Sequence, residues 1–383
     1  MDLIEKIRRF KFDDIDLNQL TEDELNFYKG IDLFIKGDLD SSESILLKLH
    51  LQSNEKEIKD NATKILFQIL YWQNKWSEIK RLNLDKNLLI DEDYRSISIR
   101  YEKLNQNYNF LSDFASIPMK LSSSGSPTID VKINGVYKTF WFDTGALISI
   151  ISEETAELCN IKMEDDLTVK VKASTGKCTE SRMCTVPSLE LGNFKVYDQI
   201  MIIIATENLI LKHPKTNEIV KIDGIIGWDL IKDMNVIIDY KNEKIEIRKP
   251  KKLSCEDRNM FCSAYPIIKI LNDENKPIYF GLDTGANKCS LGETFSINKE
   301  NIKFQTSFIG GVGGYKEKEV KTVGNLKIRI KNEEFVLKDR NISMDLETVG
   351  EFFIMDGIIG SDIIKDGKMI IDYTNKMFSV ERQ

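Results

Sequence analysis

Histidine is almost absent from this chain of 383 residues, which has only His50 and His213. Neither histidine has a second one at ligand spacing, so a histidine-based zinc site or a Ser-His-Asp triad is hard to assemble. The six cysteines form no Cys-x-x-Cys pair, and a chain of this size needs no disulfides to hold its core. We therefore expect no metal and no cofactor, and the sequence argues against metalloenzymes and serine hydrolases.

Long apolar runs are missing as well, since stretches such as residues 200–205 (IMIIIA) have only the length of a strand. The net charge of −7 gives no electrostatic reason to expect nucleic acid or an acidic membrane as a partner. The first residues, MDLIEKIRRFKFDD, carry charges throughout and lack the apolar centre of a secretion signal. We expect a cytoplasmic protein, provided that Met1 is the natural start.

Proline does not occur in residues 1–112, and the only glycines there are Gly30 and Gly37. Apolar residues recur at helical spacing in this range, for example in ILFQIL at 65–70. Thr21 followed by Glu24 is a capping-box pattern, which predicts the start of a helix. Residues 1–112 are therefore predicted to form an α-helical domain.

Two stretches of this range are similar to tetratricopeptide repeat units. The first is YKGIDLFIKGDLDSSESILLKL at 28–49, and the second is ATKILFQILYWQNKWSEIKRL at 62–82. The resemblance covers about 60 residues and implies a helical surface that recruits a protein partner. A small helical bundle packed on the rest of the chain is the alternative, and it is left open here.

From Ile117 onward the chain changes to short runs rich in β-forming residues. SSSGSP at 122–127 predicts a turn, and the runs before and after Asn134-Gly135 predict a hairpin, since this pair favours tight two-residue turns. The basic and polar segment RKPKKLSCEDRN at 248–259 is the best candidate for a linker.

An internal repeat decides the organisation of this second part. DGIIGWDLIKDMNVIIDYKN at 223–242 matches DGIIGSDIIKDGKMIIDYTN at 356–375 at 14 of 20 positions. Each copy follows one Asp-Thr-Gly-Ala, by 80 residues in the first copy and by 73 in the second. The order of apolar strand, Asp-Thr-Gly-Ala, variable middle and Asp-Gly-Ile-Ile-Gly thus occurs twice, and the linker lies between the copies. We expect two all-β lobes related by a pseudo-twofold axis, at 113–250 and 251–383.

Each Asp-Thr-Gly-Ala places a carboxylate at the end of an apolar run, FWFDTGALISII at 140–151 and YFGLDTGANKCS at 279–290. A lone carboxylate there is costly to bury. If the two lobes pack about their axis, Asp143 faces Asp283, and two close carboxylates share one proton. One acid then serves as a base toward water while the other donates a proton to a substrate carbonyl, without histidine or metal. The shared proton also explains why the buried charge is tolerated.

The residues beside the two acids fit this interpretation. The hydroxyls of Thr144 and Thr284 are expected to bond to the backbone of the opposite loop, and Gly145 and Gly285 let backbone amides approach the carboxylates. Alanine follows each triplet where serine or threonine would offer a further donor. One donor fewer predicts a less acidic pair.

The paired Asp-Thr-Gly-Ala and Ile-Ile-Gly motifs resemble those of clan AA aspartic proteases of the retropepsin-like kind, over about residues 115–383. The resemblance implies that Asp143 and Asp283 are catalytic, and that the Ile-Ile-Gly segments at 225–227 and 358–360 support the acid loops in the core. This chain departs from retroviral enzymes because both lobes lie in one chain. It departs from pepsin-like enzymes in its alanines, its strong similarity between lobes and the lack of a secretion signal.

Members of that family close flaps over the substrate, and each copy has a turn in the matching interval. In the first copy the flap is predicted at Ser174, Thr175 and Gly176, and in the second around Val312, with Gly311 and Gly313 beside it. Glycine permits a mobile hairpin whose amides reach a peptide backbone. A plain surface hairpin is the alternative in both places.

Other residues in the repeat receive structural interpretations. Cys289 is predicted to be a small buried core residue rather than an oxidation sensor, and Asp239 and Asp372 are predicted to serve turns. Trp228, which corresponds to Ser361 in the second copy, either shapes the cleft or fills the core.

The sequence as a whole predicts an α+β protein with an aspartic endopeptidase activity directed at a peptide or protein substrate. A catalytically silent peptide-binding or scaffold protein of the same fold is the alternative, since fold alone does not establish activity. A third arrangement, an enzyme kept latent by its helical domain, also remains open.

Overall fold

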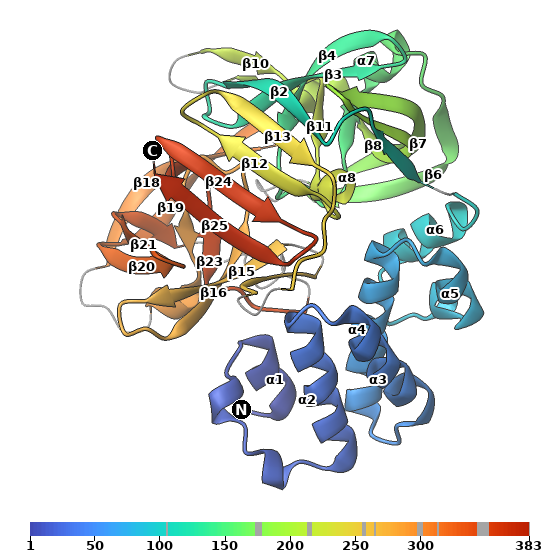
Figure 1. Ribbon diagram of the computed structural model, residues 1–383, viewed down its shortest axis with the longest axis vertical. Coiled ribbons are helices and arrows are strands. Elements are labelled where there is room, and N and C mark those ends of the chain that lie inside the picture. Colours follow the sequence, from blue (N-terminus) through green and yellow to red (C-terminus); the bar gives the residue numbers. More distant parts are fainter. Residues whose placement is uncertain are drawn as a thin grey trace.

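The computed structural model describes residues 1–104, 106–172, 178–212, 217–254, 258–263, 266–296, 302–311, 314–342 and 352–382. The chain begins with a helical region and continues as a mostly β region with curled sheets (Figure 1). The helices of the first region are α1 (Leu3–Arg8), α2 (Glu22–Ile35), α3 (Leu39–Gln52), α4 (Lys56–Trp72), α5 (Trp76–Arg81) and α6 (Glu92–Arg100).

The predicted start of the second helix is confirmed. Thr21 Oγ1 accepts a hydrogen bond from the backbone N–H of Glu24, whose side chain in turn accepts one from the N–H of Thr21, so α2 begins with a capping box. The end of the region differs from the prediction, because residues 107–110 form a strand rather than part of a helix. This strand pairs with β8 of the following sheet and so adds to the β region.

The first part of the β region forms a large mixed sheet. Its strands are β1 (Asn107–Phe110), β2 (Phe114–Leu121), β3 (Pro127–Ile133), β4 (Val136–Phe142), β5 (Ile150–Ser152), β6 (Met163–Lys172), β7 (Cys178–Leu191), β8 (Phe194–Ile204), β11 (Gly224–Ile226), β12 (Asn235–Asp239) and β13 (Lys244–Arg248). Two short helices, α7 (Glu153–Leu158) and α8 (Trp228–Ile231), and a separate ribbon of β9 (Ile210–Lys212) and β10 (Ile219–Lys221) accompany it. The predicted hairpin turns at Asn134-Gly135, where both residues have positive φ.

The second part of the β region forms another sheet. Its strands are β14 (Met260–Cys262), β15 (Pro266–Asn272), β16 (Pro277–Leu282), β17 (Ser290–Leu291), β18 (Lys303–Gly311), β19 (Gly314–Val323), β20 (Leu326–Ile330), β21 (Glu333–Leu337), β22 (Arg340–Ile342) and β23 (Gly357–Ile359). Residues 249–254, inside the predicted linker, carry neither helix nor strand.

The last two strands leave the second sheet and join the first. They are β24 (Gly367–Asp372) and β25 (Met377–Arg382). Strand β24 pairs antiparallel with β12, so that Ile237 lies opposite Ile370, while β25 forms the outer edge. The C-terminal end of the chain is therefore held to the first sheet by the backbone hydrogen bonds between β24 and β12.

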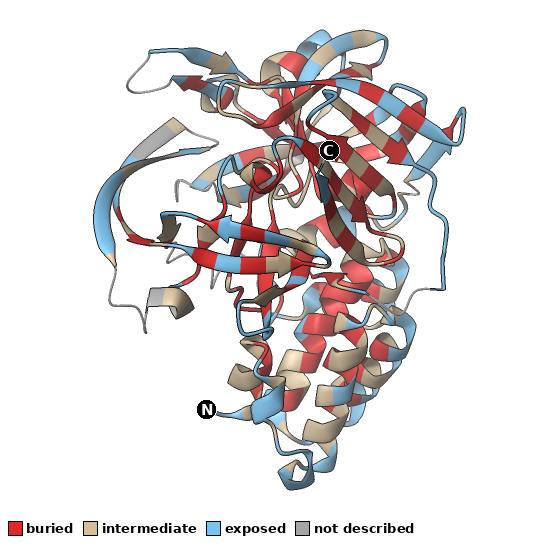
Figure 2. Ribbon diagram, turned by 60° about the vertical axis from the view of Figure 1, so that its left-hand side comes forward, coloured by how far each residue is buried: buried red, intermediate tan, exposed pale blue. Residues whose placement is uncertain are grey.

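The helical region shares an apolar core with the β region. The ring of Phe10 stacks on Tyr279, with centroids 3.9 Å apart, and Trp72 packs against Trp228 at 4.9 Å. Buried apolar residues of the helices and of both sheets belong to one cluster (Figure 2). The helices are thus packed against both parts of the β region.

Candidate active site

The two Asp-Thr-Gly-Ala segments directly follow β4 and β16. In each copy the strand of the Ile-Ile-Gly motif, β11 or β23, lies parallel to the strand that precedes the acid. The N–H of Asp143 donates to the carbonyl of Ile226 at 2.9 Å, and the N–H of Asp283 donates to that of Ile359 at 3.0 Å. Each acid is therefore held at the end of a buried strand by its own Ile-Ile-Gly segment.

The two loops meet and are bonded to each other through their threonines, as the sequence predicted. The N–H of Thr144 donates to Thr284 Oγ1 at 3.0 Å, and the N–H of Thr284 donates to Thr144 Oγ1 at 3.1 Å. Each hydroxyl also donates to the carbonyl of the residue before the opposite acid, Leu282 at 2.9 Å and Phe142 at 2.8 Å. Both threonines are fully buried, so these four bonds are shielded from water and fix the loops to each other.

The glycines of the two triplets lie against the opposite carboxyl groups. A methyl group added to Gly145 would lie 2.6 Å from Cγ of Asp283, and one added to Gly285 would lie 2.5 Å from Cγ of Asp143. No side chain fits in that space, so only glycine permits the two acids to approach. The two carboxyl groups therefore lie close enough for each to affect the pKa of the other.

The electrostatic environment of the two acids is unequal. Burial raises the pKa of Asp283 well above its usual value, and the neighbouring charge of Asp143 raises it further. Burial also raises the pKa of Asp143, but Asp143 Oδ1 accepts from the N–H of Gly145 at 2.8 Å and from that of Gly285 at 3.3 Å, which opposes the rise. The pair is therefore expected to retain one proton, and the reaction proposed below places that proton on Asp283. Both residues remain half-buried rather than sealed from solvent.

Behind each acid loop lies a further aspartate, Asp229 in the first copy and Asp362 in the second, which the sequence analysis did not identify. In the first copy, Asp229 accepts from the N–H and the hydroxyl of Ser149, and burial raises the pKa of Asp229 to about 6. In the second copy, Asp362 accepts from the N–H of Cys289 and pairs with Arg340 at 2.6 Å. Both aspartates occupy the same position of the repeat, two residues after the Ile-Ile-Gly glycine, and that identity was a signal in the sequence.

The predicted flap residues are only partly within the described chain. Gly311 ends β18 and pairs with Gly314 at the start of β19, so a hairpin is present in the second copy. Val312 and Gly313, between these strands, lie outside the described residues. Ser174, Thr175 and Gly176 also lie outside them, between β6 and β7, which pair as neighbouring antiparallel strands.

The structural interpretations of other repeat residues are confirmed. Asp239 and Asp372 accept hydrogen bonds from the backbone and side chain of the asparagine three residues later, at 2.7–3.0 Å, and so close turns. Cys289 is 2% exposed and belongs to the core. Trp228 is buried against Trp72 of the helical region, and so it fills the junction between the two regions.

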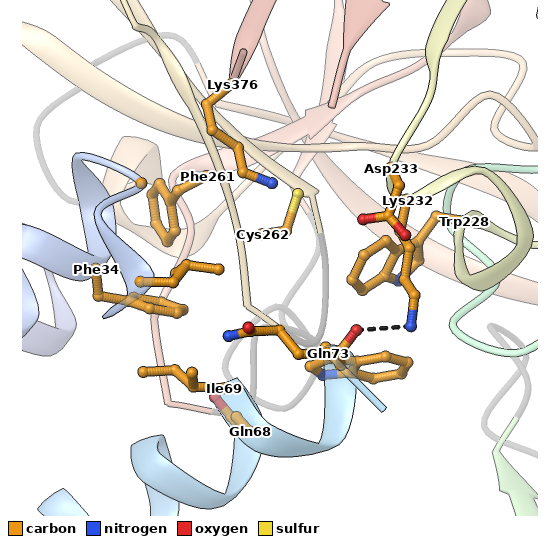
Figure 3. A pocket seen from close by; sticks show the side chains of 13 residues that line it. Phe34, Gln68, Ile69, Gln73, Trp228, Lys232, Asp233, Phe261, Cys262 and Lys376 are labelled. Atoms are coloured by element: carbon orange, nitrogen blue, oxygen red, sulfur yellow. Dashed lines mark hydrogen bonds between the residues drawn. The ribbon is translucent and has the colours of Figure 1, made fainter. Parts of the chain in front are cut away.

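A small hollow at this junction is separate from the acid pair. Its lining includes Phe34, Trp72, Trp228, Phe261 and Lys376, and none of its lining residues belongs to either acid loop (Figure 3). Lys232 Nζ donates to the carbonyl of Trp72 at 2.6 Å beside it, which fixes the end of α4 to the β region. Within the described ranges, no three histidine, cysteine or acidic side chains gather as a set of metal donors.

A family model described as aspartyl protease matches residues 129–230. This range contains the first Asp-Thr-Gly-Ala, its Ile-Ile-Gly and Asp229, and it ends before the second copy begins. Residues 129–230 are therefore similar to an aspartyl protease domain, and the match covers about a quarter of the chain. No curated protein matches the chain. In the described part, no helix is long and apolar enough to cross a membrane.

Proposed function

We propose that the protein is an aspartic endopeptidase, whose active site is the acid pair Asp143 and Asp283. The observation that carries the proposal is the cross-bonded pair of Asp-Thr-Gly loops, which come from positions 140 residues apart and bring two carboxyl groups into hydrogen-bond contact. The aspartyl protease match over residues 129–230 agrees with it. An acid pair that shares one proton supplies both a base and an acid near neutral pH.

The proposal includes two retropepsin-like lobes, 113–250 and 251–383, which are related by a pseudo-twofold axis. The pairing of β12 with β24 supports this arrangement. In the alignment of the two repeats, Ile237 corresponds to Ile370, and these two residues lie opposite each other in the antiparallel pair. A residue that faces its own counterpart is what a twofold axis through that point requires. The reciprocal bonds of Thr144 and Thr284 agree with the same axis.

In the proposed reaction, a water molecule lies between the two acids and attacks the carbonyl carbon of the substrate peptide bond. Charged Asp143 takes a proton from the water, while protonated Asp283 donates its proton to the carbonyl oxygen. The tetrahedral intermediate then collapses, the C–N bond breaks, and the leaving nitrogen receives a proton from Asp143. Asp283 recovers its proton from the hydroxyl that becomes the new carboxyl group. No covalent enzyme intermediate forms.

The substrate is proposed to be an extended peptide or protein segment. It would lie between the two acid loops and the hairpins β6–β7 and β18–β19, with its backbone bonded to the hairpins as an added strand. In the proposal, the predicted flap positions from 174 to 176 and from 311 to 313 bind the substrate. The helical region is proposed to recruit a protein substrate or partner.

The test is cleavage of a diverse peptide pool from about pH 3 to about pH 8 by the full chain, by Asp143→Asn and by Asp283→Asn. Wild type should cleave, and both variants should lose essentially all cleavage. Asp273→Asn is the matched control, because Asp273 is exposed in the turn between β15 and β16 and lies away from the pair. It should cleave as wild type does. A folded wild type that cleaves nothing would instead favour the silent peptide-binding protein.

A further inference from the structure

The serine-rich turn between β2 and β3 is held in a single compact shape. The N–H of Ser122 donates to the carbonyl of Ser126 at 2.9 Å, and the N–H of Ser126 donates back to Ser122 Oγ at 3.1 Å. The N–H of Gly125 closes the turn on the carbonyl of Ser122 at 2.8 Å. Ser126 is 1% exposed, although the turn belongs to a surface connection. A buried hydroxyl at this place needs a partner.

That partner lies in the other copy of the repeat. Ser126 Oγ donates to the carbonyl of Gly285 at 2.9 Å, across 159 residues of sequence. Gly125 also lies against this segment, since a methyl group added to it would be 3.5 Å from Cβ of Asn287. The turn of the first copy therefore rests on the acid loop of the second copy.

The carbonyl of Gly285 and the N–H of Ala286 belong to the same peptide group. The N–H of Ala286 donates to Asp283 Oδ1 at 2.8 Å. A peptide group that accepts a hydrogen bond at its oxygen becomes a stronger donor at its nitrogen, because the two bonds polarise the group in the same direction. The hydroxyl of Ser126 is thus connected to the carboxyl group of Asp283 through one peptide group.

We propose that Ser126 is a positioning residue of the acid pair, which orients and polarises the Gly285–Ala286 peptide so that Ala286 holds Asp283 in place. This inference rests on the proposed function for its catalytic meaning. The hydroxyl of Ser124 lies 3.4 Å from that of Ser126, and that of Ser122 lies 2.8 Å from Ser124, so a chain of hydroxyl groups leads to the peptide.

Within the described residues, the bond from Ser126 has no counterpart at the loop of Asp143. Among the residues that the structure describes, no side chain donates to the carbonyl of Gly145, which is the counterpart of Gly285. Among the described residues, the ionisable side chain beside the pair is that of Tyr373, whose buried phenol has a pKa raised by burial and in part by the charge of Asp143. Ser126 therefore acts on the Asp283 side of the pair. Its removal should weaken the donor that favours the charged form of Asp283, and Asp283 should then bind its proton more tightly.

The test follows the titration of Asp283 by carbon NMR of the full chain labelled at the aspartate carboxyl carbons, with Asp283→Asn to assign the signal. Ser126→Ala should move the Asp283 midpoint upward by a few tenths of a pH unit, about a twofold to threefold change in proton affinity. Ser126→Thr, which keeps the hydroxyl, should restore the wild-type midpoint. Ser123→Ala is the matched control, since Ser123 is exposed in the same turn.

An unchanged Asp283 midpoint in Ser126→Ala would overturn the proposal. If Ser126→Ala does not fold, Ser124→Ala replaces it, and a smaller upward shift is expected there because Ser124 acts through Ser126. An unchanged midpoint in that variant would count equally against the proposal. The same proteins are also assayed for cleavage, where the alkaline limb of kcat/KM should move upward with the midpoint. Loss of all cleavage in wild type would count against the endopeptidase and leave the NMR result to decide on Ser126.

Discussion

Asp143 and Asp283 stand in identical motifs, yet their surroundings raise the pKa of the two carboxyl groups to different degrees. Asp143 accepts from two backbone N–H groups of different loops, while burial and the charge of Asp143 raise the pKa of Asp283 well above its usual value. In the proposed reaction, the roles of base and acid follow from the neighbours of each carboxyl group rather than from the motif. The sequence predicted that the two acids meet, but nothing in it distinguishes them, because both stand in the same motif and contacts such as that of Gly285 with Asp143 form only on folding.

The raised pKa of Asp283 predicts how stability changes with pH. A carboxyl group that binds its proton more tightly when folded makes the free energy of unfolding fall as pH rises from the usual carboxyl range, near 3.8, through the raised pKa. Asp283→Asn removes this group, so its stability should fall less over that window. Urea unfolding at a series of pH values measures the difference, and Asp273→Asn should follow wild type. Parallel curves for wild type and Asp283→Asn would contradict the assignment of the proton.

The buried threonine bonds predict a defined loss of stability. Thr144→Val keeps the shape of the side chain but removes the hydroxyl that donates to Leu282 and accepts from Thr284. Because it leaves buried groups without partners, it should lower the free energy of unfolding by about 2 kcal/mol. Thr144→Ser retains the hydroxyl and should cost clearly less. Equal losses in urea unfolding would show that the methyl group, rather than the bonds, matters.

The close approach of each glycine to the opposite acid predicts a loss of activity. In Gly145→Ala the new methyl group would force Asp283 away, and a displacement of about 1 Å can cost about a hundredfold in rate. We expect kcat/KM to fall by at least that factor in the peptide assay. Gly324→Ala is the control, because a methyl group there meets nothing within 4 Å. Near-wild-type cleavage by Gly145→Ala would exclude the close pairing of the acids.

At the scale of elements, the β6–β7 hairpin is packed against the helical region. Strand β6 lies at the edge of its sheet, and helix α6 contacts it. Asp93 accepts from the backbone N–H of Lys170 at 2.8 Å, and Arg100 pairs with Glu164 at 2.6 Å. The helical region thus covers an edge that would otherwise offer unpaired backbone groups. The β6–β7 hairpin is tied to this helix.

This contact predicts a local change in hydrogen exchange. Asp93→Ala removes the acceptor of the Lys170 N–H, so the amide of Lys170 should exchange about fivefold to tenfold faster, which corresponds to a net bond of about 1–1.4 kcal/mol. Glu92→Ala removes an exposed neighbouring acid and should leave the rate unchanged. The amides of β18 and β19 serve as an internal reference. Equal rates at Lys170 in both variants would show that Asp93 does not hold the strand.

The elements themselves were predictable to different degrees. The capping box at Thr21 and the hairpin at Asn134-Gly135 depend on a few neighbouring residues, and both were predicted correctly. The strand at 107–110 was missed, because its partner lies in β8, almost ninety residues further on. The contact of α6 with β6 has no local pattern either. Long-range pairing of this kind is set by packing and not by propensity.

At the scale of the whole molecule, the helical region is part of the common core. Phe10 stacks on Tyr279, and Ile225 and Ile358 of the two Ile-Ile-Gly segments belong to the same apolar cluster as the helices. The sequence left open whether the helices recruit a partner, form a simple bundle or keep the enzyme latent. Their packing shows only that their removal would expose apolar surface of both sheets.

A truncated chain that starts at residue 106 should therefore unfold or aggregate rather than gain activity. The milder change Phe10→Ala should lower the free energy of unfolding by about 3–5 kcal/mol, because it removes a buried ring from the junction. Leu17→Ala, at a side chain that is 43% exposed, is the control. Thermal unfolding measures both variants. A stable, soluble truncated chain that cleaves peptides faster than the full chain would instead support latency.

The internal repeat explains why the meeting of the two acid loops could be predicted from the sequence. Two ordered copies of both motifs were enough to predict that Asp143 and Asp283 meet, since equivalent loops gather where two copies pack. The support from Asp229 and Asp362 and the bond from Ser126 were not foreseen. They depend on which surfaces face each other after folding.

The burial of Trp228 against Trp72 has a consequence for the history of the two copies. At the matching position of the second copy, Ser361 donates its hydroxyl to the carbonyl of Ala286. The side chain at this position therefore contacts a helix in the first copy and a loop in the second. In a dimer of identical chains, one amino acid would have to suit both surroundings. A single chain removes that restriction, and each copy is free to diverge toward its own neighbour.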